Sequence, residues 1–322
     1  MIEVVALLGN KYYNTSMIQY LYKNRKHTKL QLLEDYKVGS WISVENPTEQ
    51  ELLLLAEKLN LESDILLDAL DSYEVPRIEK EENVTYIFAR FAHKNGDKIV
   101  TSPVLLVVSA DFLMTISIKA LPFIDTFLQE KVEFYTTQKT KLLILLFMEM
   151  QKDYQRLVNA INRNIRNISS DLDQIDNKEI MTIVKFETLF NDFLFGLEPM
   201  GIALKKFANG KFIKLYEEDE DLIEELLVDN EQLILLCKVN QKGIYNLRES
   251  HYSVLSNNLN KTMKLLTSVT VILTIPTMVS SFFGMNVGLP FQTHPLAFLF
   301  IIAVTLIISF SLLAVFNKRD LL

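Results

Sequence analysis

Residues 265–283 read LLTSVTVILTIPTMVSSFF, and residues 296–316 read LAFLFIIAVTLIISFSLLAVF. Neither stretch contains an ionisable side chain. A helix needs about 20 residues, at 1.5 Å each, to cross the roughly 30 Å hydrocarbon layer of a bilayer. Both stretches therefore qualify as membrane spans. The first stretch is rich in hydroxyl groups and would make a poor lipid-facing helix. The alternative interpretation of this stretch is a buried helix in the core of a soluble protein.

Composition narrows the class of protein further. The chain has 322 residues and a net charge of −7, which disfavours a binder of nucleic-acid phosphates. Its single cysteine, Cys237, excludes an intrachain disulfide and a multi-thiolate zinc site. The sequence contains neither a phosphate-binding P-loop nor a dinucleotide-binding glycine motif. We therefore expect neither an enzyme nor an organic cofactor.

Basic residues lie before the first apolar stretch and after the second, but not between the two. Lys261 and Lys264 precede the first stretch, and Lys318 and Arg319 follow the second, whereas residues 284–295 contain neither Lys nor Arg. Because Lys and Arg are retained on the cytoplasmic side, both ends of the hairpin should be cytoplasmic. We expect a multi-pass protein of a bacterial plasma or inner membrane, with both termini inside.

The N-terminal third predicts a small α/β domain. Thr48 and Glu51 match a capping box that opens an amphipathic helix ending at Leu59, and a second helix is expected over Ser63–Ser72. Strands are predicted from β-branched and alternating segments. These segments are Glu3–Leu8, Ser40–Val44, Thr85–Ala92, Pro103–Ser109 and Phe112–Lys119.

Long helices follow this domain. Ile124–Ser170 contains neither Gly nor Pro, and Lys178–Asn209 continues the same helical periodicity, which predicts two long antiparallel helices. A third helix begins near Glu217 and meets no proline before Pro276. It is expected to be a stalk that continues into the first span, and at 1.5 Å per residue it would be about 100 Å long.

A polar stripe runs along the stalk and the first span. Its members alternate in steps of four and three, which places them on one helical face. They are Ser256, Asn260, Met263, Thr267, Thr270, Thr274, Thr277, Ser281 and Gly284. Two interpretations remain open: close packing of helices through hydroxyl groups, or a water-filled pore. Two spans cannot enclose a pore, so the second interpretation requires a homo-oligomer.

The tripeptide Gly284-Met285-Asn286 comes directly after the first span and before a short loop. In this position, with a second span close to the C-terminus, it resembles the signature of the CorA family of magnesium channels. The family segment Asn-x-x-Met-(Lys)-x-Leu-Thr corresponds to Asn260–Thr267, and the polar ring near the outer third of the family's pore matches Thr277. The resemblance extends over the whole chain.

The resemblance implies an α+β cytoplasmic domain, long helices and two C-terminal transmembrane helices, assembled as a CorA-like funnel that is a homopentamer in the lipid bilayer. The first spans would line the pore and the second would form an outer ring. The expected parts are the α/β domain (1–122), long antiparallel helices (123–216), a stalk helix (217–264), the first span (265–283), an extracytoplasmic loop (284–295), the second span (296–316) and a basic cytoplasmic tail (317–322).

The resemblance also assigns site residues. Gly284, Met285 and Asn286 would form the selectivity filter. The pore would be lined by Asn260, Met263, Leu266, Thr267, Thr270, Thr274, Thr277 and Ser281. Three departures from the family pattern are visible. Thr274 occupies the place of a constriction methionine, Pro276 lies one residue later than usual, and the outer loop lacks the acidic residues that are often present there.

The chemistry expected of Asn286 follows from the ion. Mg²⁺ requires octahedral oxygen ligands and loses its waters reluctantly, so a fast pore should hold the hydrated ion through its water shell. Amide oxygens of Asn286 and backbone carbonyls at Gly284 are neutral acceptors for those waters. The alternative is that Asn286 merely caps the span.

A regulatory site is implied on the cytoplasmic side. Acidic residues crowd the start of the stalk helix, a pattern that is also typical of a solvated helix N-terminus. In the family, intracellular Mg²⁺ joins an aspartate of the α/β domain to an acidic residue on the stalk of the next subunit. These positions correspond to Asp68 and Glu225, and Glu224 or Asp229 would serve after a small shift of register.

The sequence therefore predicts a channel for hydrated divalent cations, with Mg²⁺ influx driven by the membrane potential and closed by intracellular Mg²⁺. One alternative is a zinc, cobalt or nickel transporter of the same family. The other, from a different class, is a membrane-anchored cytosolic sensor or scaffold that conducts nothing. The expected partners are further copies of the chain, lipid and divalent cations, and not nucleic acid.

Overall fold

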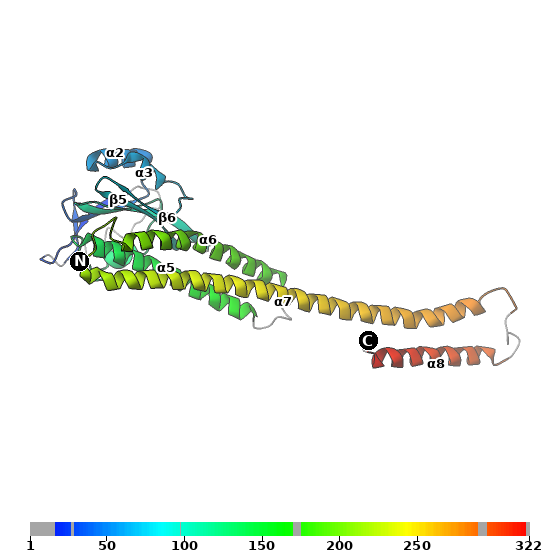
Figure 1. Cartoon of the computed structure of the whole chain (residues 1–322). Coiled ribbons are helices and arrows are strands. Elements are labelled where there is room, and N and C mark those ends of the chain that lie inside the picture. The colour runs from blue at the N-terminus through cyan, green and yellow to red at the C-terminus, as the bar shows by residue number, and fades with distance from the viewer. Residues whose placement is uncertain (1–16, 27–28, 97, 170–174, 289–294, 320–322) are drawn as a thin grey trace. The chain divides into compact units, whose positions relative to one another are not determined.

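The computed structural model describes residues 17–26, 29–96, 98–169, 175–288 and 295–319 (Figure 1). The strand predicted at Glu3–Leu8 lies outside these residues, as do most of the loop between the spans and the end of the tail. The described residues form two compact units. The first comprises those up to Ile168 together with Asn177–Tyr245, and the second comprises Ser169–Asp176 and the chain from Asn246 onward.

A seven-stranded sheet forms the centre of the first unit, in the order β2-β1-β3-β7-β6-β5-β4. Neighbouring strands are antiparallel except for β3 and β7, which are parallel with Ile42 opposite Met114. The strands are β1 (Met17–Tyr22), β2 (Gln31–Leu33), β3 (Ser40–Glu45), β4 (Arg77–Glu81), β5 (Val84–Asn95), β6 (Lys98–Val108) and β7 (Phe112–Ser117).

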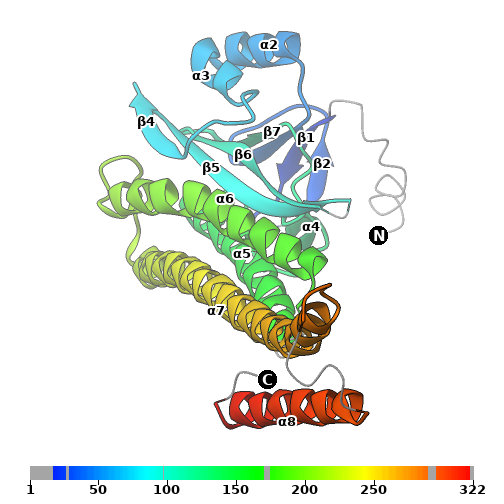
Figure 2. The same cartoon turned by 90° about the vertical axis from the view of Figure 1, so that its right-hand side faces the viewer.

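Two short helices, α2 (Glu49–Leu59) and α3 (Ser63–Asp68), cover one face of the sheet (Figures 1 and 2). They bury Leu52, Leu55 and Leu66 against the strands. The predicted capping box is confirmed, because the Glu51 N–H donates to Thr48 Oγ1 at 3.3 Å and the Thr48 N–H donates to Glu51 Oε2 at 2.7 Å.

Three further helices lie on the other face of the sheet (Figure 2). They are α4 (Ile124–Leu128), α5 (Lys139–Ser169) and α6 (Asn177–Ala208). The prediction of one helix over Ile124–Ser170 was wrong. Glu130 adopts a left-handed conformation, with φ of 52°, and ends α4. The chain then buries Phe134 against Trp41, at 6.2 Å between ring centroids, so aromatic packing overrides helical periodicity there.

The predicted strands at Ser40–Val44, Thr85–Ala92, Pro103–Ser109 and Phe112–Lys119 are confirmed to within a few residues as β3, β5, β6 and β7. The helix expected over Ser63–Ser72 is shorter than predicted and ends at Asp68. Arg90 on β5 explains its end, because the buried guanidinium donates to the carbonyls of Ser72 at 3.0 Å and Glu74 at 2.9 Å. These carbonyls are thereby held outside a helix.

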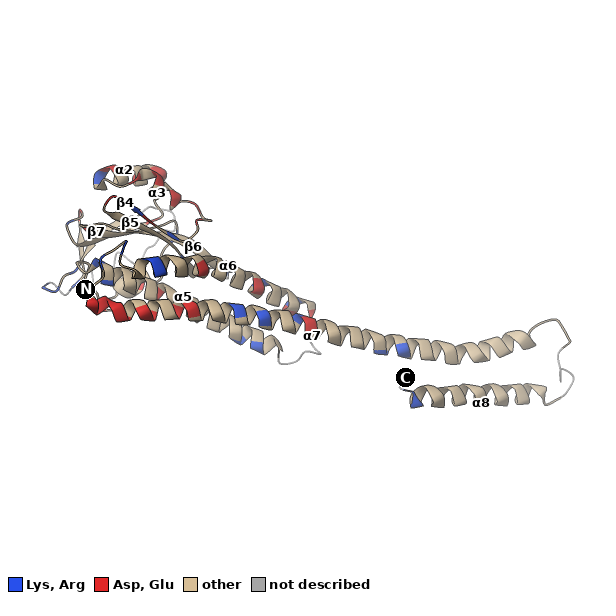
Figure 3. Ribbon diagram, in the orientation of Figure 1, with Lys and Arg blue, Asp and Glu red and all other residues tan. Residues whose placement is uncertain are grey.

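The stalk and the first span are one helix, α7 (Glu217–Phe283), as predicted. The second span is α8 (Ala297–Lys318). Both helices are long and apolar enough to cross a membrane. Figure 3 shows α8 free of charged residues until its C-terminal end, and the C-terminal part of α7 equally free of them.

The capping box makes a local stability prediction. Thr48→Ala removes the acceptor of the Glu51 N–H, a loss that costs about 1 kcal/mol for a typical helix cap. Hydrogen exchange of the backbone amides in α2 should therefore accelerate about fivefold. Glu51→Gln is the matched control, since Gln still reaches back to the N-cap N–H. Equal acceleration in both variants would contradict a stabilising role of the Thr48 side chain.

Candidate functional site: the exposed face of α7

The polar stripe predicted from the sequence lies on one exposed face of α7. Every member from Ser256 to Gly284 is exposed in the single chain, and so is Leu266. The stripe therefore has no packing partner among the described residues of its own chain. Its hydroxyl groups within the apolar stretch 265–283 are polar groups on a helix that is long and apolar enough to cross a membrane.

The second span packs on a different face of α7. Within the second unit, α8 runs back beside the end of α7 (Figures 1 and 2). Ser268 of α7 is 4% exposed and Thr305 of α8 is 8% exposed, and they are the two buried polar residues described in these spans. Ser268 shares its helical face with the half-buried Ile272, Ile275 and Val279. At 100° per residue this face points roughly opposite to the stripe.

The threonine hydroxyls of the stripe bond to their own helix. Oγ1 donates to the carbonyl four residues earlier at Thr270 (2.8 Å), Thr274 (2.7 Å) and Thr277 (3.0 Å). A hydroxyl has one hydrogen and two acceptor lone pairs. Because the hydrogen is already donated, the outward side of each oxygen can only accept. The stripe thus offers acceptors suited to the hydrogens of water around a cation.

The tripeptide Gly284-Met285-Asn286 stands at the C-terminal end of this face. The Gly284 N–H donates to the Ser280 carbonyl at 3.0 Å, and the Met285 N–H donates to the Phe282 carbonyl at 3.3 Å. All three residues are exposed. The end of a helix carries a partial negative charge and unpaired carbonyl groups, and both favour a nearby cation.

In the first unit, α7 has two faces with heptad spacing. Ile223, Leu226, Leu233, Cys237 and Ile244 are buried. Their face is tied to α5 by Gln151 Nε2, which donates to the Leu226 carbonyl at 3.0 Å. The side chain of Asn230 ties it to α6 by donating to the Leu197 carbonyl at 3.2 Å.

The opposite face of this part of α7 is exposed. It carries Glu225 followed by the apolar side chains of Val228, Leu235 and Val239, which are 45%, 61% and 58% exposed. Steps of three and four connect these residues to the polar stripe further along the same helix. The same series of three- and four-residue steps therefore runs from Glu225 to Gly284 in the sequence.

The two acidic positions predicted for regulation lie apart in one chain. Asp68 ends α3 on one side of the sheet, whereas Glu225 belongs to α7, beyond the helices on the other side (Figure 2). Glu224 and Glu225 are exposed, and Asp229 is half-buried. The described residues contain no group of three or more His, Cys, Asp or Glu side chains that could hold a metal ion. A bridge between Asp68 and Glu225 therefore needs two copies of the chain.

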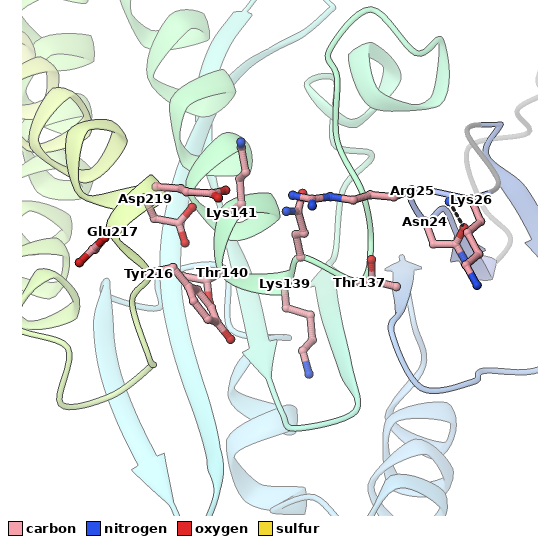
Figure 4. Close-up of a pocket in the computed structure, with 12 residues that line it drawn as sticks. Asn24, Arg25, Lys26, Thr137, Lys139, Thr140, Lys141, Tyr216, Glu217 and Asp219 are labelled. Carbon is pink, nitrogen blue, oxygen red and sulfur yellow. Dashed lines mark hydrogen bonds between the residues drawn. The ribbon is translucent and has the colours of Figure 1, made fainter.

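A cavity of about 940 Å³ lies where α5 and α7 begin, between Asn24–Lys26, Thr137–Lys141 and Tyr216–Asp219 (Figure 4). Asp219 is buried there, and burial raises the pKa of its carboxyl while Lys141 opposes the shift. Further along, Glu231 pairs with Lys205 of α6 at 2.7 Å. The acidic start of α7 is thus only partly a solvated face, which its charge pattern alone did not reveal.

The fold defines a membrane protein built around one long helix. This helix is a stalk that continues into the first span, and it follows an α/β domain and precedes a second span in the sequence.

The curated relative named Cobalt/magnesium transport protein CorA, from Methanocaldococcus jannaschii, is 24% identical over 296 residues, which cover 88% of this chain and 92% of the relative. The complete CorA magnesium transporter structure from that organism covers 94% of this chain and 98% of its own, with a TM-score of 0.82 and 22% identity. Full-length CmaX matches 94% of this chain and 99% of its own, with a TM-score of 0.71 and 16% identity.

The family model described as CorA-like Mg²⁺ transporter protein matches residues 36–319. The chain belongs to this family, and it is a divalent cation transporter of the membrane.

The exposed face of α7 makes an accessibility prediction. If the stripe lies against water, Thr277→Cys should react with a small membrane-impermeant thiol reagent, whereas Ile307→Cys, at an exposed position of the apolar helix α8, should not. Cys237 adds no background, since it is buried and burial raises the pKa of its thiol to about 12. The measurement is the labelling rate of the full chain in liposomes. Equal rates at the two positions would contradict a wet stripe.

Proposed function

We propose that the chain forms a homopentameric channel for hydrated Mg²⁺ in the plasma or inner membrane, with both termini in the cytoplasm. The observation that carries this proposal is the exposed acceptor stripe of α7, which ends at Gly284-Met285-Asn286 and has no packing partner among the described residues of its own chain. Five copies would turn the stripe toward a common axis, with α8 outside. The proposal involves no enzymatic step and no organic cofactor.

The proposed filter works through the water shell of the ion. A ring of Asn286 amide oxygens, with carbonyls at the ends of the α7 helices, would accept hydrogens from the coordinated waters. Below it, the threonine oxygens continue the row of acceptors. A divalent ion entering an inside-negative cell gains about 4.6 kcal/mol per 100 mV, twice the 2.3 kcal/mol of a single charge, so influx needs no ATP.

The cytoplasmic side would sense the transported ion. We propose that Mg²⁺ bridges Asp68 of one copy and Glu225 of the next, with Glu224 or Asp229 as further ligands. Without the metal, acidic α7 starts would repel one another around the ring. Bound metal would remove that repulsion and stabilise the closed assembly through its higher affinity for that state.

Other divalent ions are the alternative cargo. The curated relative is named for both cobalt and magnesium. Since neutral oxygen acceptors contact only the water shell, they discriminate weakly between hexahydrated ions that carry the same charge. A liposome flux assay that compares Mg²⁺, Co²⁺, Ni²⁺ and Zn²⁺ decides which ion is preferred.

Asn286 supplies the test of the filter. Asn286→Ala removes the amide acceptors and should reduce Mg²⁺ uptake into liposomes by at least tenfold without changing assembly. Asn286→Asp should also reduce it, because a ring of carboxylates would hold the ion too tightly to release it.

Asn317→Ala, at the far end of α8, is the matched control and should transport like the unchanged chain. Native mass measurement should give five copies for every variant. Uptake at the wild-type rate in Asn286→Ala would refute the filter assignment, and a stable monomer or dimer would refute the pore.

The regulatory site makes a second prediction. Asp68→Ala combined with Glu225→Ala should raise by several-fold the internal Mg²⁺ concentration that halves the flux, since two carboxylate ligands are lost. The measurement is Mg²⁺ influx into liposomes loaded with graded Mg²⁺. An unchanged midpoint would mean that the sensor lies elsewhere in the chain.

A further inference from the structure

Asp68 forms an ion pair with Arg77 of its own chain. The Arg77 guanidinium donates from Nη2 to Asp68 Oδ2 at 2.7 Å. The same side chain donates from Nη1 to Glu74 and from Nε to Glu79. One positive charge therefore lies among three carboxylates, so the cluster keeps a formal charge of −2.

The guanidinium is fixed in place from several directions. It lies over the Phe88 ring, with 4.0 Å between Cζ and the ring centroid, an arrangement that favours a cation. Arg77 begins β4 and pairs in register with Phe88 of β5. Arg90 holds the connection that carries Glu74 through hydrogen bonds to the carbonyls of Ser72 and Glu74. Arg77 is thus part of a built arrangement rather than a mobile surface side chain.

We infer that Arg77 is the built-in competitor of the regulatory cation at Asp68, and that it sets the concentration of divalent ion at which the transporter closes. This inference rests on the proposed regulatory role of Asp68. A divalent ion that approaches Asp68 must either displace the guanidinium or bind beside it. Both alternatives weaken binding, the first through a lost ion pair and the second through repulsion between cations.

The geometry favours displacement from Asp68 alone. Arg77 keeps Glu74 and Glu79 as partners when Asp68 turns away, so the guanidinium is not left unpaired. The exposed fraction of the Asp68 side chain is 48%, the highest of the three carboxylates, against 36% for that of Glu79 and 13% for that of Glu74. Asp68 is therefore the carboxylate that can reach a neighbouring copy, and Arg77 is the charge that restrains it.

The test replaces the competitor and leaves the carboxylates intact. Arg77→Gln should lower the internal Mg²⁺ concentration that halves the flux by roughly three- to tenfold, the range expected when a partly exposed ion pair is lost and a like charge is removed. Flux into liposomes without internal Mg²⁺ should stay unchanged, because Arg77 contacts no pore residue. A merely structural role would instead reduce this flux or the yield of assembled protein.

Three further variants sharpen the test. Arg77→Lys keeps the cation but loses the planar fork of the guanidinium, so its midpoint should lie between those of Arg77→Gln and the unchanged chain. Arg77→Met keeps an extended side chain over Phe88 and replaces Arg77→Gln if that variant fails to assemble. Lys58→Gln breaks another exposed ion pair of the first unit, with Asp35 at 2.6 Å, and should leave the midpoint unchanged because Asp35 is not a proposed ligand.

The outcomes separate this inference from the proposed function. A lower midpoint in Arg77→Gln, with that of Arg77→Lys between Arg77→Gln and wild type, supports the competitor. An unchanged or higher midpoint in Arg77→Gln overturns it, provided that Asp68→Ala shifts the midpoint. If Asp68→Ala has no effect on the midpoint, the proposed sensor fails, and the inference fails with it.

Discussion

The structure depends on one constraint, that polar groups on a membrane-spanning helix need partners where lipid offers none. The threonines of α7 satisfy their hydroxyl hydrogens within the helix, which lowers but does not remove the cost of facing hydrocarbon. Asn260 precedes the apolar stretch 265–283 and Asn286 follows it, so their amides can meet water outside the hydrocarbon layer. The proposed pentamer would place the hydroxyl stripe of the span itself around water.

The same series of three- and four-residue steps runs through the stalk and the first span. An ideal α-helix drifts about 20° per heptad from a strict 3.5-residue repeat, so a stripe of many heptads stays on one side only if the helices supercoil to the left. In the first unit, the buried face of α7 follows the same repeat as its exposed face. Packing against α5 and α6 therefore fixes the direction in which Glu225 is presented in the first unit.

Local signals account for what the sequence predicted. The capping box of Thr48 and Glu51 depends on neighbours within a few residues. The two spans depend on the length and the apolar character of a stretch. Both kinds of signal can be read from one sequence. The strand β4, with the sequence RIEKE, was missed because charged residues are typical of a sheet edge and carry no apolar alternation. The break before α5 depends on Phe134 reaching Trp41, a contact that no local pattern contains. The cluster of Arg77 with Asp68, Glu74 and Glu79 was also missed. These side chains become neighbours only because α3 ends at Asp68, earlier than predicted.

A sensor must release its ligand at the concentration that it reports. Without a counter-charge, the carboxylates of the proposed sensor would bind the divalent ion roughly three- to tenfold more tightly, so the site would fill at a lower concentration of Mg²⁺. Pairing with Arg77 gives Asp68 a second stable state, in which the carboxylate is satisfied without metal. In the proposed sensor, the guanidinium and the metal would compete for Asp68, and the concentration of the ion would set the populations of the open and closed assemblies.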